Sequence, residues 1–428
     1  MKKLLFILVL FTSLSTAKAQ RFSNIVYEDF VYVDYIKSVQ FYLNGYELSN
    51  PMINLQDQNP LLLLFDDLNN QVEDYYYTII HCDMDWQPSN LNEMEYIDGF
   101  SEERINDYEF SSLTLTPYIN YSVSIPDRNM GITKTGNYLL VVYKKDRNPI
   151  PVITRRFVVY EPKLLVDGQL VRPNKVSKLR THQEIDFNVY RDPKFPIRSP
   201  MQEIRAVVLQ NGRWDNATIP LKPFFIRPQQ LAFDYQDQIV FEGGKEFRFI
   251  DLRSLRRRNF NIASIERGVD GFEVYLAMDR ARVREPYVSI NDANGRFTIE
   301  TQDQGDSFLS ADYANVLFSY KVDQADIDQD PYILGAFNDW RISEDYRMIY
   351  NAALNAYVLK IPLKQGYYNY QYAMVPRDAE ERVPSTTETE GNWHETENDY
   401  TVLIYYRPFG GRYDQVVGFA TINSVRNN

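Results

Sequence analysis

The sequence predicts an all-β protein made of tandem β-sandwich domains. Three observations support this: the chain contains 33 Tyr, 25 Phe and 4 Trp in 428 residues, apolar and polar residues alternate in many short segments, and turn residues separate those segments. Aromatic side chains favour strands because they fit a pleated, half-buried surface. No amphipathic repeat of helical period competes with the alternation.

The first residues are typical of a secretory signal peptide, which we predict to span 1–19. Two lysines precede an apolar run over 4–11, and Ala17-Lys18-Ala19 supplies the small residues of a cleavage site. Cleavage there makes Gln20 the first residue, so the cysteine-linked lipid anchor of a bacterial lipoprotein is not expected. We therefore expect an exported, soluble protein.

Net charge and cysteine content exclude further classes of protein. Loss of the signal peptide removes three lysines and takes the formal net charge from −12 to −15. General nucleic-acid binding is disfavoured because such a surface repels phosphate. No later segment reaches the roughly 18 apolar residues of a membrane-spanning helix. Cys82 is the only cysteine, so no internal disulfide can form and packed cores must supply the stability.

Alternation and turns mark individual strands along the chain. In 185–189 every second residue is apolar, which places one face of a strand in a core. The same period recurs over 316–322 and 357–363. Asn211-Gly212 follows an apolar run, and Asn-Gly is the strongest short-range signal of a β-hairpin.

An outer-membrane barrel is a less favoured interpretation of the same composition. Barrel strands are roughly 10 residues long and joined by short turns on one side. Here the segments are shorter, and 21 prolines lie near many of them, as in 192–196. The C-terminal Arg426-Asn427-Asn428 also lacks the terminal aromatic residue usual in such barrels. Tandem immunoglobulin-like sandwiches fit better.

Three domains are predicted after the signal peptide. A strand-like run ends on Pro162, which closes an N-terminal domain over 20–162. A polar stretch over 301–306 separates a middle domain, 163–308, from a C-terminal domain, 309–428. Sequence patterns locate elements better than their ends, so each boundary is approximate.

The segment His81-Cys82-Asp83-Met84-Asp85-Trp86 gathers a thiol, an imidazole and two carboxylates. Neighbouring residues on a strand point to opposite faces, so the thiol and the imidazole cannot both reach one centre. Zinc needs three or four ligands, and no second histidine is near. We therefore expect a strand end with a buried Cys82 and two turn-forming aspartates, and no metal.

Asp326, Asp328 and Asp330 have the spacing of the first ligands of a calcium loop. The following positions depart from that loop, because Pro331 stands where it needs Gly and Phe337 where it needs Glu. A solvated acidic linker is the expected structure.

Arg253, Arg256, Arg257 and Arg258 belong to the one basic concentration in this acidic chain. They are candidates for binding an acidic partner surface or lipid phosphate through charge-assisted hydrogen bonds. A solvated edge strand is the alternative, and Arg253 could equally pair with Asp251 inside the protein. Both interpretations remain open at this point.

Catalytic motifs are absent from the sequence, which has no Gly-x-Ser-x-Gly, no phosphate-binding glycine loop and no His-Glu-x-x-His. Three scattered histidines leave few general bases. We therefore expect no enzyme, no catalytic residues and no cofactor. A glycosidase with a carboxylate pair stays open, because 58 acidic residues offer many pairs without singling one out.

Residues 332–340 and 357–372 resemble the early-set β-sandwich of glycogen- and starch-binding modules. In that family the tryptophan that matches Trp340 stacks on sugar. Gln371 stands where the family carries Lys, and the second sugar-stacking tryptophan has no counterpart. The resemblance implies an early-set fold for the C-terminal domain and makes Trp340 a candidate glycan-stacking residue.

A larger resemblance extends from about Val39 to Ser424, to the plug protein family of the type IX secretion system of Bacteroidota. Many stretches in one order carry it: Pro51-Met52-Ile53-Asn54-Leu55, Phe65-Asp66-Asp67-Leu68, His81-Cys82-Asp83-Met84-Asp85-Trp86, Tyr96-Ile97-Asp98-Gly99-Phe100, Gly136-Asn137-Tyr138, Gln210-Asn211-Gly212-Arg213-Trp214-Asp215, Gly243-Gly244-Lys245-Glu246-Phe247-Arg248, Asp251-Leu252-Arg253-Ser254-Leu255, Leu363-Lys364-Gln365-Gly366-Tyr367-Tyr368 and Tyr413-Asp414.

This resemblance implies a periplasmic, non-enzymatic protein at the inner face of the outer membrane. It would bind the periplasmic opening of the outer-membrane translocon barrel and close the pore while no cargo passes. A periplasmic glycan-binding protein that uses Trp340 is the alternative. The two differ, because sugar binding should persist in the isolated C-terminal domain, whereas pore closure should need the multi-domain body.

Overall fold

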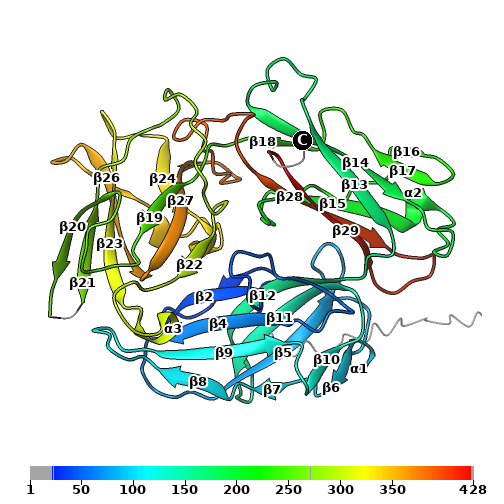
Figure 1. Cartoon of the computed structure of the whole chain (residues 1–428), viewed down its shortest axis with the longest axis horizontal. Coiled ribbons are helices and arrows are strands. Elements are labelled where there is room, and N and C mark those ends of the chain that lie inside the picture. The colour runs from blue at the N-terminus through cyan, green and yellow to red at the C-terminus, as the bar shows by residue number, and fades with distance from the viewer. Residues whose placement is uncertain (1–21, 23, 270, 426–428) are drawn as a thin grey trace, which may run out of the picture.

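Short strands account for nearly all the regular structure in the described part of the chain. The computed structural model describes residues 22, 24–269 and 271–425, so the predicted signal peptide lies outside the described residues. The strands form several mainly antiparallel sheets, which confirms the predicted all-β class. The α-helices are single turns, and no described helix is long and apolar enough to cross a membrane. Three apolar cores divide the strands into three units (Figure 1).

The N-terminal unit packs two sheets around one core. One has the strand order β1-β12-β11-β5-β7 with β3 beside β12, and the other has the order β2-β4-β9-β8. Its elements are β1 (Phe30–Val31), β2 (Ile36–Leu43), β3 (Met52–Asn54), β4 (Leu61–Asp67), β5 (Tyr75–Cys82), α1 (Glu93–Tyr96), β6 (Ile97–Gly99), β7 (Glu103–Arg104), β8 (Asp107–Phe110), β9 (Ile119–Ile125), β10 (Met130–Ile132), β11 (Gly136–Lys144) and β12 (Ile150–Tyr160).

The middle unit is a second sandwich. One sheet has the order β13-β14-β17-β16 with β18 beside β14, and the other has the order β15-β28-β29. Ile185, Phe187 and Val189 are buried in β14, as the alternation predicts. The elements are β13 (Leu165–Val171), β14 (His182–Tyr190), α2 (Pro200–Glu203), β15 (Ile204–Gln210), β16 (Phe225–Ile226), β17 (Gln230–Phe233), β18 (Val240–Glu242), β28 (Asp399–Tyr406) and β29 (Gln415–Asn423).

The third unit contains the sheet β20-β21-β23-β26-β25 and the sheet β19-β27-β22 with β24 beside β27. Its elements are β19 (Arg248–Asp251), β20 (Ile262–Arg267), β21 (Phe272–Leu276), β22 (Phe297–Ile299), α3 (Ser307–Ser310), β23 (Tyr313–Lys321), β24 (Gln329–Leu334), η1 (Ala336–Asn338), η2 (Glu344–Tyr346), β25 (Ile349–Asn351), β26 (Ala356–Lys364) and β27 (Gly366–Pro376).

Strand pairing joins segments on both sides of the predicted domain boundaries. β21 and β23 pair across the boundary expected at 308, and β28, from the end of the chain, pairs with β15 of the middle unit. Alternation identifies a strand and its buried face but carries no information about its partner. We propose that the third unit, 248–376, is inserted between two parts of the middle unit, 163–242 and 399–423.

Candidate functional site

The arginine segment 253–258 follows β19 and forms a turn that buried side chains hold in place. Leu252 and Leu255 are buried in the core of the third unit. The Asp303 carboxylate accepts hydrogen bonds from the Ser254 hydroxyl at 2.6 Å and from the Leu255 N–H at 2.9 Å. The two leucines therefore hold the turn, which presents the arginines after it to solvent.

The four candidate arginines have two different environments. Arg253 makes a bidentate ion pair with Asp251, with both N···O distances 2.8 Å, and a longer contact of 3.3 Å to Glu300. Residues 256–258 are exposed, and none of them forms an ion pair with another described residue. The Arg258 guanidinium donates only to the Ala263 carbonyl, at 2.9 Å. Arg253 is thus used in ion pairs within the third unit, as the alternative interpretation expected, whereas the other three are free of such pairs among the described residues.

A groove of about 240 Å³ lies beside these arginines, where a loop of the N-terminal unit meets the third unit. Its walls combine apolar side chains, such as Leu115 and Phe272, with polar and charged ones, such as Arg256, Arg267 and Asp303. Leu113, at its rim, is 72% exposed. A groove that combines apolar side chains with exposed guanidinium groups suits a protein-binding surface, in which arginine and large apolar residues carry most of the binding energy.

Trp340 follows η1 and packs where the units meet. The Arg213 guanidinium covers one face of the indole, with 4.0 Å to the ring centroid. Phe247 contacts the indole edge-on, with centroids 5.6 Å apart, and a Cβ added at Gly295 would lie 2.4 Å from the ring. A pyranose on the covered face would have to displace Arg213. Trp340 therefore packs as a residue of the junction.

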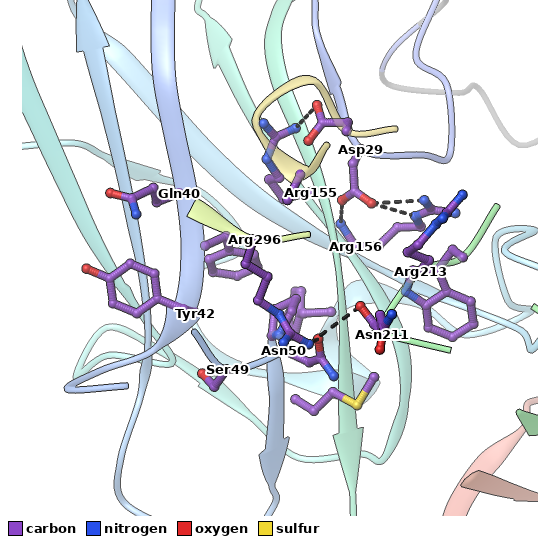
Figure 2. A pocket seen from close by; sticks show the side chains of 18 of the residues that line it. Asp29, Gln40, Tyr42, Ser49, Asn50, Arg155, Arg156, Asn211, Arg213 and Arg296 are labelled. Atoms are coloured by element: carbon purple, nitrogen blue, oxygen red, sulfur yellow. Dashed lines mark hydrogen bonds and ion pairs between the residues drawn. The ribbon is translucent and has the colours of Figure 1, made fainter. Parts of the chain in front are cut away.

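A cavity of about 180 Å³ lies at the junction of the three units (Figure 2). Arg296 of the third unit donates to the Asn50 side chain at 2.8 Å and lies 3.5 Å from the Asn211 carbonyl, so it bridges to both other units. Burial lowers the pKa of this guanidinium. Arg155 of the N-terminal unit pairs with Asp339 of the third at 3.3 Å. The cavity walls therefore link all three units.

A second joint connects the N-terminal and third units through a buried ion pair. The Lys364 ammonium lies 2.7 Å from the Asp66 carboxylate, and the two side chains are 2% and 1% exposed. Tyr313 and Asn120 also donate to this carboxylate, at 2.6 and 2.8 Å, and the ammonium lies 3.9 Å from the ring centroid of Tyr118. Burial lowers the pKa of Lys364. The contacts of Lys364 and Tyr313 with Asp66 depend on the two units keeping their relative position.

A third joint connects the N-terminal and middle units. Buried Asp414 accepts the Met84 N–H at 2.9 Å and a bidentate pair of bonds from Arg407, both at 2.8 Å. Arg407 also forms an ion pair with Asp83 at 2.8 Å. The Tyr405 hydroxyl adds a bond of 2.8 Å to Asn137 across the same interface.

The cluster that begins at His81 is a strand end, as predicted. β5 ends at Cys82, whose thiol is buried, and burial raises its pKa well above the usual range. The His81 ring packs among Tyr96, Tyr138 and Tyr413. Its Nε2 lies 3.1 Å from the Thr135 carbonyl, and burial lowers the pKa of the imidazole to about 4. This histidine is therefore a neutral core residue.

The expected solvated acidic linker is wrong for one of its three aspartates: Asp326 and Asp328 lie in a turn, whereas Asp330 is buried in β24 and pairs with Arg377 at 2.7 Å. Asp326 accepts hydrogen bonds from the backbone N–H groups of Asp328 and Gln329, at 2.9 and 3.0 Å. Within the described part of the chain, no group of three or more His, Cys, Asp or Glu residues could hold a metal ion. The Asp326 carboxylate thus accepts hydrogen bonds from the backbone of its own turn.

One part of the chain matches a known protein family, and nearly the whole chain matches a solved structure. Residues 36–161 match the family model described as the Type 9 secretion system plug protein 1st domain. The solved structure of a hypothetical protein from Parabacteroides merdae is 31% identical, with a TM-score of 0.88 over 94% of this chain and 100% of that chain. No curated protein matches the chain. The architecture of three joined units thus recurs in a relative.

Proposed function

The chain belongs to the plug protein family of the type IX secretion system, and from that premise we propose that it closes the periplasmic opening of the outer-membrane translocon barrel. Closure would last while no cargo is in transit. The family supports a structural rather than a catalytic role, and a periplasmic or outer-membrane-associated location. Binding of the barrel and sealing of the pore are the steps that we propose beyond the family assignment.

The family match over 36–161 carries this proposal, and the joints between the units support it. A plug must resist deformation across the opening that it covers. Buried ion pairs and hydrogen bonds fix the N-terminal unit to both other units, and Arg296 adds a bridge at the centre. Because these bonds would be broken by rotation of one unit against another, we expect the molecule to move as one body.

The partner can be tested by affinity purification of the tagged, signal-processed protein from native Bacteroidota envelopes. Near-equal recovery of a very large outer-membrane barrel would support the proposal, and pore-conductance assays with and without the protein would then test sealing. Absence of any such barrel after extraction in mild detergent would overturn it.

Reversal of three arginines is expected to weaken barrel binding. Arg256, Arg257 and Arg258 are exposed beside a groove of mixed polar and apolar lining and are not used in ion pairs among the described residues. Replacing all three with Glu should lower barrel recovery by about tenfold or more, because arginine anchors often carry a large share of interface energy. Quantitative mass spectrometry of the purified complex measures the change.

A matched control changes the net charge equally at another exposed place. Arg172, Lys175 and Arg180 of the middle unit are also exposed, and their replacement with Glu should leave recovery near the wild-type level. Equal losses in both triple variants would indicate a general charge effect. Unchanged recovery after reversal of 256–258 would remove the arginine segment from the interface.

A further inference from the structure

Strand β16 carries the most concentrated run of exposed large apolar side chains in the middle unit. Phe224, Phe225 and Ile226 are consecutive and are 50%, 53% and 44% exposed. The two phenyl rings contact each other, with centroids 4.4 Å apart. These three residues are called the β16 patch below, and β16 lies at the periphery of the molecule (Figure 1). Contiguous exposed apolar residues of this kind mark interaction surfaces.

The charge around the patch is opposite to that of the whole protein. Lys222 and Arg227 flank the aromatic residues, both are exposed, and neither forms an ion pair with another described residue. No Asp or Glu occurs over 216–233, although the chain has 58 acidic and 46 basic residues, and the exposed Asp234 follows at the end of β17. Arg191 adds a further cation at this end of the sheet, where its guanidinium donates to the Pro228 carbonyl at 3.3 Å. The β16 patch is therefore an apolar surface with a basic rim.

The backbone of β16 is poorly suited to pairing with another protein strand. β16 is the edge strand of its sheet, but it is only two residues long. Pro223 and Pro228 bracket it, and proline cannot donate a hydrogen bond to a ladder. Any partner must therefore be recognised by the side chains rather than by β-augmentation.

We propose that the β16 patch binds the surface of a bilayer that contains anionic phospholipids. Phenylalanine and isoleucine side chains enter the region between headgroups and acyl chains, while Lys222 and Arg227 contact headgroup phosphates. Aromatic residues and basic residues in combination are typical of such peripheral contacts. The identity of the membrane rests on the proposed function, which places the patch against the periplasmic leaflet of the outer membrane beside the barrel opening. There it would hold the plug close to the opening after release.

A second edge strand provides a comparison within the same molecule. β8 is also at a sheet edge and exposes two aromatic residues, Tyr108 at 38% and Phe110 at 56%. Here the alternate residues are Asp107 and Glu109, so the local charge repels anionic headgroups. If exposed aromatic area alone were sufficient, both edges would bind lipid. Charge complementarity distinguishes them and favours β16.

The test uses the full mature chain, residues 20–428, in co-sedimentation with phosphatidylethanolamine vesicles that contain phosphatidylglycerol. The double variant Phe224→Ser, Phe225→Ser should lower the partition coefficient by about tenfold. The variant Lys222→Gln, Arg227→Gln should lower it severalfold, and added salt should weaken wild-type binding, because the headgroup attraction is screened. Thermal unfolding checks that each variant is folded.

The control variant Tyr108→Ser, Phe110→Ser should bind vesicles as the wild type does. Absence of wild-type binding, or an equal loss in the β8 control, would overturn the lipid proposal. If the wild type ignores vesicles while Phe224→Ser, Phe225→Ser loses the translocon barrel in affinity purification, the patch is a protein contact and the lipid proposal is wrong. Vesicle binding by a protein that recovers no barrel would support the lipid contact and overturn only the plug function.

Discussion

Replacement of Lys364 with Met is expected to lower the free energy of unfolding by about 3–5 kcal/mol. The Lys364 ammonium lies 2.7 Å from Asp66, deep in the joint between the N-terminal and third units. Methionine fills a similar volume but leaves a buried carboxylate without its cation, and an uncompensated buried charge is strongly destabilising. Urea unfolding followed by tryptophan fluorescence measures the change.

A lysine on the same strand provides the control. Lys360 also lies in β26 and pairs with Glu273 at 2.9 Å, but it is 53% exposed. Because water screens such a pair, Lys360→Met should change stability little. Adding Asp66→Asn to Lys364→Met should recover part of the loss, since it removes the orphaned charge. Equal losses for the two single lysine variants would contradict the assigned role of the buried pair.

Local sequence patterns predict the strands of this protein better than their pairing. Over Ile185–Val189 of β14 every second residue is buried, so alternation is sufficient to identify this part of the strand. Asn211 and Gly212 adopt φ angles of 54° and 70°, the two positive values that suit a tight hairpin turn. Yet the return segment makes only an isolated bridge from Leu221 to Ala206, and β15 pairs mainly with β28. Long-range pairing is decided by packing, which the period of a strand does not encode.

The contacts that join the units likewise cannot be predicted from local sequence patterns. Asp66 and Lys364 are separated by 298 positions, and neither lies in a spacing that predicts an ion pair. Both residues lie in stretches that carry the family resemblance, and so does Asp414 of the third joint. Membership of these stretches is the one feature of the sequence that points to them. The Arg253 pair with Asp251 could be anticipated as an alternative because only two positions separate the residues.

Acid is expected to destabilise the protein through His81. Burial lowers the pKa of this imidazole from 6.5 to about 4, so the folded state holds it neutral while the unfolded state binds a proton below about pH 6.5. Above pH 6.5 the imidazole is neutral in both states and costs the folded state nothing. As the pH falls from 6.5 toward 4, the unfolded state gains a proton that the folded state does not bind, so the free energy of unfolding decreases. Between about pH 7 and pH 4 the loss from this group amounts to about 3 kcal/mol.

Comparison with His81→Gln isolates this contribution, because glutamine keeps an N–H for the Thr135 carbonyl but does not titrate. A direct comparison of pH values would not isolate it: burial raises the pKa of Asp292 to about 7, so this group changes stability in the opposite direction. The stability lost between neutral and acidic pH should be about 3 kcal/mol larger in the wild type than in His81→Gln. His182→Gln, at a half-buried histidine, should reduce the loss less. Parallel pH profiles for the wild type and His81→Gln would contradict this prediction, because they would show that folding does not lower the pKa of His81.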